Sequence, residues 1–217
     1  MESWREVAYL VVGLFIGVIL HEYMHARIAD MRGDHTARNA GRLTLNPLPH
    51  IDPFGTILLP LALVLLFRGN GPVFGYAKPV PVNPFFLRRR KDMMYVALAG
   101  PLTNFAIAGI FTLVGAVIHL AGIRAGSSSS AVYQLFLLLY YVAAVNVLLG
   151  VFNLIPIPPL DGSQVLSAFL SHEAQVQYER LAPYGFVIIF ALLWLAGNLF
   201  FKLISPLYRL IASAMGI

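Results

Sequence analysis

His21-Glu22-Tyr23-Met24-His25 closes a long apolar run that begins at Val7. Residues four apart share one face of a helix, so His21 and His25 can present two imidazoles to one metal ion. Glu22 follows the first histidine, where a carboxylate can take a proton from a metal-bound water. Such a cluster costs several kcal/mol in hydrocarbon unless it is paired or metallated. The pattern therefore predicts a zinc site inside a membrane protein.

The composition also places the chain among membrane proteins. Of its 217 residues, 59% are hydrophobic and 12% are charged, whereas a soluble domain carries about 25% charged residues. We assign the net charge of +5 to membrane orientation rather than to nucleic acid, because the basic residues flank apolar spans. The chain contains no cysteine, which excludes disulfides and thiolate metal sites. The first apolar run lacks the features of a signal peptide, so we interpret it as a retained span.

The hydropathy pattern predicts an all-α multi-pass membrane protein with about five or six hydrophobic segments. Four segments are long enough to cross the bilayer, namely 4–29, 93–122, 131–154 and 184–204. The segment 54–67 is shorter and contains Pro60, so we expect it to insert partly or to re-enter. The tail, 206–217, is expected to form an interfacial helix.

A proline-rich stretch at 73–84 follows the short segment. Pro79, Pro81 and Pro84 exclude a helix and permit an extended chain or an edge strand. We therefore expect a small re-entrant extended or β ribbon. Its free edge groups, around Phe74 to Val82, are predicted to pair with an extended substrate by strand addition.

A catalytic zinc site with two histidines needs a further protein ligand. Asp161 is the best candidate, because it is the carboxylate of a proline-broken segment, 153–162, that ends the span 131–154. Irregular backbone at membrane depth is tolerated only where protein buries it or where it lines a cavity. Asn104 and Asn153 can donate hydrogen bonds to a substrate carbonyl or a developing oxyanion, and ties between helices are the alternative for both. We interpret His50 as a loop residue bonded to backbone, with a fourth metal ligand as the alternative.

These motifs together resemble the site-2 protease family of intramembrane zinc metalloproteases. The resemblance rests on His-Glu-x-x-His at 21–25, Gly-Pro-x-x-Asn at 100–104 and Asn-x-x-Pro-x-Pro-x-Leu-Asp-Gly at 153–162. It implies that His21, His25 and Asp161 bind one zinc ion and that Glu22 is the catalytic base. It also implies cleavage of peptide bonds in or near the membrane segments of transmembrane protein substrates, as in regulated intramembrane proteolysis.

The stretches 41–47 and 77–84 resemble the compact prokaryotic branch of this family. We expect a single transmembrane metalloprotease domain over 1–217, with a catalytic core at 4–165 and C-terminal helices at 166–217. No PDZ or CBS domain is expected, and the additional preceding span of some relatives is expected to be absent.

The spans also predict an orientation. Metal ligands must meet at one depth, so the ends of the segments 4–29 and 131–154 face the same side of the membrane. Basic residues gather on that side, namely Arg27, Arg32, Arg38, Arg42 and 88–91. The positive-inside rule makes this side cytoplasmic. We therefore expect a multi-pass protein of the cell membrane with its active site toward the cytoplasm.

Three other functions are alternatives to a protease. A metal transporter or channel lines a path with acidic and histidine residues on several spans, whereas here these residues converge on one place. An inactive relative binds transmembrane helices without cutting them, and the intact Glu22 argues against it. A membrane di-iron oxygenase needs more histidine clusters than six scattered histidines supply.

Overall fold

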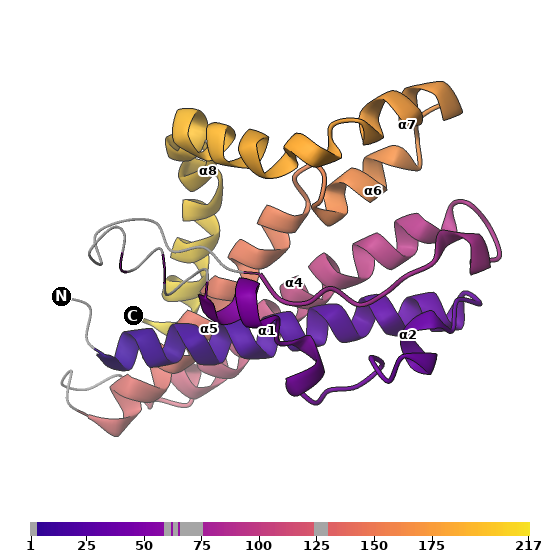
Figure 1. The fold of residues 1–217 in the computed structure, drawn as a ribbon. Coiled ribbons are helices and arrows are strands. Elements are labelled where there is room, and N and C mark those ends of the chain that lie inside the picture. Colours follow the sequence, from indigo (N-terminus) through magenta and orange to yellow (C-terminus); the bar gives the residue numbers. More distant parts are fainter. Residues whose placement is uncertain (1–3, 59–61, 63–64, 66–75, 124–129) are drawn as a thin grey trace.

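The structure, a computed structural model, describes residues 4–58, 62, 65, 76–123 and 130–217 (Figure 1). Its α-helices are α1 (Trp4–Met31), α2 (Thr36–Asn39), α4 (Asp92–Leu120), α5 (Ala131–Asn153), α6 (Asp161–Ser167), α7 (His172–Glu179) and α8 (Gly185–Met215). Short 3₁₀ turns occupy Leu48–His50, Pro84–Phe86 and Ala182–Tyr184, and a π-helical turn occupies Pro53–Leu58.

The described residues confirm the prediction of an all-helical protein, and they contain candidate membrane spans. Four stretches are long and apolar enough to cross a membrane, namely Trp4–Met31, Asp92–Leu120, Ala131–Asn153 and His172–Met215. They include the four long segments predicted from the sequence. A separate fifth or sixth segment is not found among the described residues, because half of 54–67 lies outside them and the tail 206–217 continues α8.

The predicted ribbon is described from Tyr76 onward, and residues 76–83 contain no strand. The N–H groups of this stretch that form hydrogen bonds donate to other parts of the chain and not to a neighbouring strand. Tyr76 donates to the carbonyl of Gly55 over 3.0 Å, and Lys78 donates to the carbonyl of His50 over 2.9 Å. A β-ladder needs a partner strand. The stretch is therefore an extended segment that pairs with no strand among the described residues.

The C-terminal end also differs from the expectation of a separate interfacial helix. The helix α8 continues from Gly185 to Met215 with Pro206 in its interior. Figure 1 shows a sharp turn within this helix. Proline interrupts a helical hydrogen bond and commonly bends a helix without ending it, so one element combines the last predicted span and the tail.

The helix α1 runs parallel to α5 and antiparallel to α4 (Figure 1). Along α1, Tyr9 bonds to Gln134 of α5 and the carbonyl of Gly13 bonds to Asn146, so the contacts advance together. On α4 the order is reversed. Gly17 of α1 meets Asn104, whereas Arg32 meets Asp92 at 2.9 Å, and these pairs are antiparallel. The end of α1, the start of α4 and the end of α5 therefore lie together.

Close contact between α1 and α5 depends on two glycines. A Cβ atom added at Gly13 would lie 3.1 Å from the Cα atom of Val142. One added at Gly17 would lie 2.7 Å from Oδ1 of Asn146 and 2.8 Å from Cδ1 of Leu149. Small residues let helix backbones approach within a bilayer, so these glycines set the distance between the two helices.

The largest buried apolar cluster lies between α4, α5 and the C-terminal part of α8. Phe136, Ile204 and Met215 are fully buried there, and Ala108 and Ala143 give them room. Lipid tails are as apolar as these side chains, so close packing rather than transfer from water favours this contact in a bilayer. The cluster fixes α8 to the hairpin of α4 and α5.

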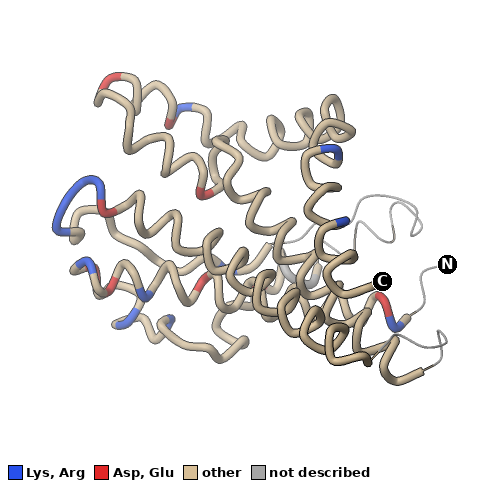
Figure 2. Tube along the Cα trace, turned by 180° about the vertical axis from the view of Figure 1, so that it is seen from behind, with Lys and Arg blue, Asp and Glu red and all other residues tan. Residues whose placement is uncertain are grey.

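Charged residues gather in sequence and space where α1 ends and α4 begins, as the coloured backbone in Figure 2 shows. Asp92 is buried and accepts from Arg32 and from the backbone N–H of Arg89. Asp34 is also buried and accepts the N–H of Asn83 over 2.7 Å. Buried carboxylates must be paired or hydrogen-bonded, and here their partners join the ribbon and the start of α4 to the end of α1.

Replacing Gly17 by alanine should destabilise the protein by about 1–3 kcal/mol, because the added methyl group overpacks the contact with Asn146. Unfolding in mixed micelles with increasing SDS measures this free energy. Gly109→Ala is the matched control, because a Cβ atom at Gly109 meets nothing within 4 Å. Equal free energies of unfolding for the two variants would contradict the proposed role of Gly17.

Candidate metal centre

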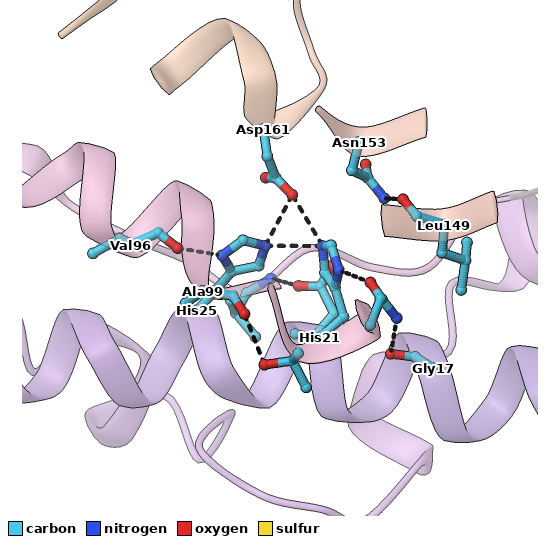
Figure 3. Close-up of polar contacts among 12 residues, drawn as sticks. Gly17, His21, His25, Val96, Ala99, Leu149, Asn153 and Asp161 are labelled. Atoms are coloured by element: carbon cyan, nitrogen blue, oxygen red, sulfur yellow. Dashed lines mark hydrogen bonds and ion pairs between the residues drawn. The ribbon is translucent and has the colours of Figure 1, made fainter. Parts of the chain in front are cut away.

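His21, His25 and Asp161 bring three ligand atoms together (Figure 3). The Nε2 atoms of the two histidines are 2.9 Å apart, and Oδ2 of Asp161 lies 3.1 Å and 3.3 Å from them. A tetrahedral zinc ion bonded to N and O atoms at about 2.0–2.1 Å holds them about 3.3 Å apart. The triangle therefore fits zinc after a small expansion.

The hydrogen bonds on the far side of each ring fix where its proton lies. His21 donates through Nδ1 to Oδ1 of Asn104 over 2.6 Å, and His25 donates through Nδ1 to the carbonyl of Val96 over 2.7 Å. A carbonyl oxygen only accepts, so each neutral ring carries its proton on Nδ1. Both Nε2 atoms then present lone pairs to the centre of the triangle, as metal-binding histidines do.

Asp161 completes a set of three acceptors. Its Oδ2 atom is buried and has no hydrogen-bond donor among the described residues. Beside two neutral imidazoles, an ionised Asp161 needs a cation as its counter-charge. Two imidazoles with one carboxylate are a donor set of catalytic zinc.

The helix α4 approaches the histidines closely at Gly100. A Cβ atom there would lie 2.4 Å from Nε2 of His25 and 2.5 Å from Nε2 of His21. Both histidines are only 7% exposed, so they have little room to move away. The absence of a side chain at this position keeps the space next to the ligand atoms open.

The proline-rich turn 154–160 places Asp161 as the first residue of α6. Prolines lack an N–H group that would need a partner at this depth. The hydroxyl of Tyr178 donates to the carbonyl of Pro156 over 2.8 Å and holds the turn against α7. A Cβ atom at Gly162 would lie 2.2 Å from the carbonyl oxygen of Leu154, so only glycine allows α6 to start this close to the end of α5.

The sequence is similar to those of known proteins. A model of peptidase family M50 matches residues 114–196. The relative named "Putative zinc metalloprotease YwhC" of Bacillus subtilis is 36% identical over 187 residues, which are 85% of this chain and 79% of that protein. The chain belongs to peptidase family M50.

A second M50 relative extends further along the chain. The protein named "Putative zinc metalloprotease Rip2" of Mycobacterium tuberculosis is 33% identical over 210 residues, which are 93% of this chain and 73% of that protein. No solved structure gives a significant match. Family membership confirms the resemblance to site-2 proteases, and with it the predictions of a metalloprotease and of zinc as its cofactor. The individual roles of the site residues stay predictions.

In this M50 peptidase, Glu22 faces the ribbon. Its Oε2 atom accepts the backbone N–H of Val80 over 2.8 Å. The guanidinium of Arg42 donates to the carbonyl of Lys78 over 2.9 Å and holds the same stretch. The carboxylate predicted as catalytic base is thus fixed by the segment predicted to bind substrate.

The other candidate residues are placed differently. Asn104 lies beside His21, and its Nδ2 group donates to the carbonyl of Gly17 and to Oδ1 of Asn146. Asn153 donates to the carbonyl of Leu149 within α5 over 3.0 Å (Figure 3).

His50 lies outside the group of metal-binding side chains found among the described residues. Its Nε2 atom donates to the backbone carbonyl of Thr44 over 2.9 Å. The structure thus brings His21, His25, Asp161 and Asn104 into one bonded group.

The sequence reasoning did not single out Asn146. This residue is fully buried in the middle of α5 and contacts Asn104 through a hydrogen bond of 2.8 Å. A lone asparagine inside an apolar span was the available signal, because a polar group at that depth must find a partner.

Gly100→Ala should weaken zinc binding by at least tenfold, in the range of about 10–100-fold for changes that misplace metal ligands. The added methyl group would lie against both Nε2 atoms. Competition with a chelator in detergent measures the affinity, and Gly109→Ala on the same helix is the control. Wild-type zinc affinity in Gly100→Ala would show that the ion lies elsewhere.

Proposed function

We propose that this M50 peptidase is an intramembrane zinc endopeptidase that hydrolyses peptide bonds in or near the transmembrane segments of membrane-protein substrates. The observation that carries the proposal is the triangle of three proton-free ligand atoms among candidate membrane spans. We further propose one domain, with its catalytic core at 4–165 and its C-terminal helices at 166–217. Such an enzyme performs regulated intramembrane proteolysis.

The roles within the site follow from the chemistry of peptide hydrolysis. His21, His25 and Asp161 would hold one zinc ion per chain, which would supply Lewis acidity toward the scissile carbonyl and the attacking water. Glu22 takes a proton from that water and gives it to the leaving amine. The N–H of Val80 uses one of about four lone-pair sites of the carboxylate, so Glu22 keeps the capacity to hold the water while its orientation is fixed.

Asn104 and Asn153 have different proposed roles. Both N–H groups of Asn104 are used by other acceptors and its oxygen accepts from His21, which favours a role in orienting the metal ligand. Asn153 ends α5, just before the turn that leads to Asp161. We propose that rotation of its amide toward the site supplies a donor for the developing oxyanion.

The ribbon offers an extended substrate one of its two edges. The N–H groups of Tyr76, Lys78 and Val80 all bond to the protein itself. Alternate residues of an extended chain face opposite edges, so the carbonyls of 77 and 81 are proposed to face the other way, whereas the carbonyl of Pro79 accepts from Arg42 over 3.4 Å. Pro79 and Pro81 have no N–H group, and this edge therefore accepts hydrogen bonds from a substrate that has been unwound.

The basic residues at the end of α1 and the start of α4 support a cytoplasmic position of the site (Figure 2). We propose that the protein lies in the cell membrane with Asp161 toward the cytoplasm. The opposite end of the bundle, where α4 ends, then faces outward.

Glu22→Gln should retain about one zinc ion per chain and lose cleavage of single-span substrates by about 10²–10⁴-fold, because general base catalysis is removed. Zinc content and cleavage of a substrate panel in detergent are measured together. Glu6→Gln removes the same charge from the same helix, away from the metal ligands, and is the control. Wild-type cleavage by Glu22→Gln would refute the role of Glu22.

The orientation is tested with single cysteines, because the chain has none of its own. Arg89→Cys and Ile123→Cys place thiols at exposed positions near opposite ends of α4. A membrane-impermeant maleimide applied to intact cells should label position 123 and leave 89 unlabelled until the cells are opened. Labelling of position 89 in intact cells would reverse the proposed orientation.

A further inference from the structure

Asn146 of α5 has a complete set of hydrogen bonds that fixes which way its amide points. Its Nδ2 group donates to the carbonyls of Val142 and Gly13 over 2.8 Å and 3.3 Å. A flipped amide would place Oδ1 against these two carbonyl oxygens, where no hydrogen is available. The backbone of α1 and α5 therefore forces Oδ1 of Asn146 toward α4.

Oδ1 of Asn146 in turn fixes the amide of Asn104. It accepts from Nδ2 of Asn104 over 2.8 Å, and the second hydrogen of that group goes to the carbonyl of Gly17 over 3.2 Å. Both acceptors require the nitrogen of Asn104 on their side. Oδ1 of Asn104 must then face Nδ1 of His21, at 2.6 Å.

The direction of these bonds determines the tautomer of His21. An acceptor at Nδ1 requires the proton on Nδ1, which leaves the lone pair of Nε2 for the metal. Donation therefore runs one way, from Nδ1 of His21 through Asn104 and Asn146 to the carbonyls of Gly13 and Val142. Every residue along this path is buried or belongs to the backbone of a helix.

We propose that Asn146 is a positioning residue of the metal centre. It orients Asn104, which holds His21 in the tautomer and rotation that bind zinc. The inference rests on the proposed zinc site of His21, His25 and Asp161, and it adds a residue of α5 that contacts none of these ligands directly. The close approach of Gly13 and Gly17 to α5 makes both backbone carbonyls available to the two asparagines.

Two measurements test this proposal. In metal-free wild-type protein labelled with ¹⁵N-histidine, the NMR couplings of His21 should report a proton on Nδ1. Asn146→Leu should lose this single tautomer and bind zinc about tenfold more weakly, at the lower end of the range for groups that orient metal ligands. Gln134→Leu is the matched control, because it also removes a hydrogen bond between α1 and α5 and should keep the tautomer and the affinity.

A double-mutant cycle separates orientation from general damage to the fold. If Asn146 acts through Asn104, then Asn146→Leu should cost no further zinc affinity in an Asn104→Leu background. Additive losses in the double variant would overturn the proposal. So would a proton on Nε2 of His21 in the metal-free wild type, a result that requires no variant to fold.

His21→Ala distinguishes failure of this inference from failure of the proposed site. If His21→Ala binds zinc as the wild type does, the proposed site is wrong and the positioning role falls with it. If His21→Ala loses zinc while Asn146→Leu keeps the wild-type affinity and tautomer, the inference about Asn146 alone is overturned.

Discussion

The structure depends on a requirement that polar groups among membrane-spanning helices satisfy one another. An unpaired polar group costs far more in hydrocarbon than in water. Here one connected set of hydrogen bonds meets that requirement, from the carbonyls of Gly13 and Gly17 through Asn146 and Asn104 to His21. The set joins α1, α4 and α5, so the same bonds that hold the three helices together also orient a metal ligand.

The close packing of α1, α4 and α5 brings these polar groups within bonding distance. Gly13 and Gly17 bring its backbone against α5, and Gly100 brings α4 against the rings of His21 and His25. A larger residue at any of these positions would separate groups that must lie within hydrogen-bonding or coordination distance. Glycine is therefore needed at these positions because the neighbouring groups approach so closely. Each of these glycines lies within a helix, so none is required for an unusual backbone conformation.

The sequence predicted those structural features that depend on a local pattern of residues. The four long spans follow from apolar composition, and the shared face of His21 and His25 follows from helical spacing. The position of Asp161 beside them was expected because ligands must meet, and the structure places the three together. The orienting bonds of Asn104 were not predicted, because they depend on Gly17 and Asn146 from two other helices. A single asparagine in α5 gives no sequence pattern that identifies its hydrogen-bond partner.

The ribbon and α8 show the same limit. Three prolines correctly excluded a helix around 76–83, but whether the stretch forms a strand depends on partners from distant loops, and those partners are the carbonyls of Gly55 and His50. Pro206 suggested a break after residue 204, whereas the burial of Ile211 and Met215 against α4 and α5 favours a continuous α8. Tertiary contacts outweighed the local signal in both places.

Val80 links the proposed substrate-binding edge to the proposed catalytic base. Its N–H bonds to Glu22, and it belongs to the set of alternate residues whose N–H groups bond to the protein. A substrate strand added to the ribbon would use the carbonyls of 77 and 81 on the opposite edge, since the carbonyl of Pro79 already accepts from Arg42 over 3.4 Å. Pairing would then leave the bond between Val80 and Glu22 intact. The ribbon would lie between that strand and Glu22, so the scissile bond would have to belong to a part of the substrate that continues past the ribbon toward the carboxylate.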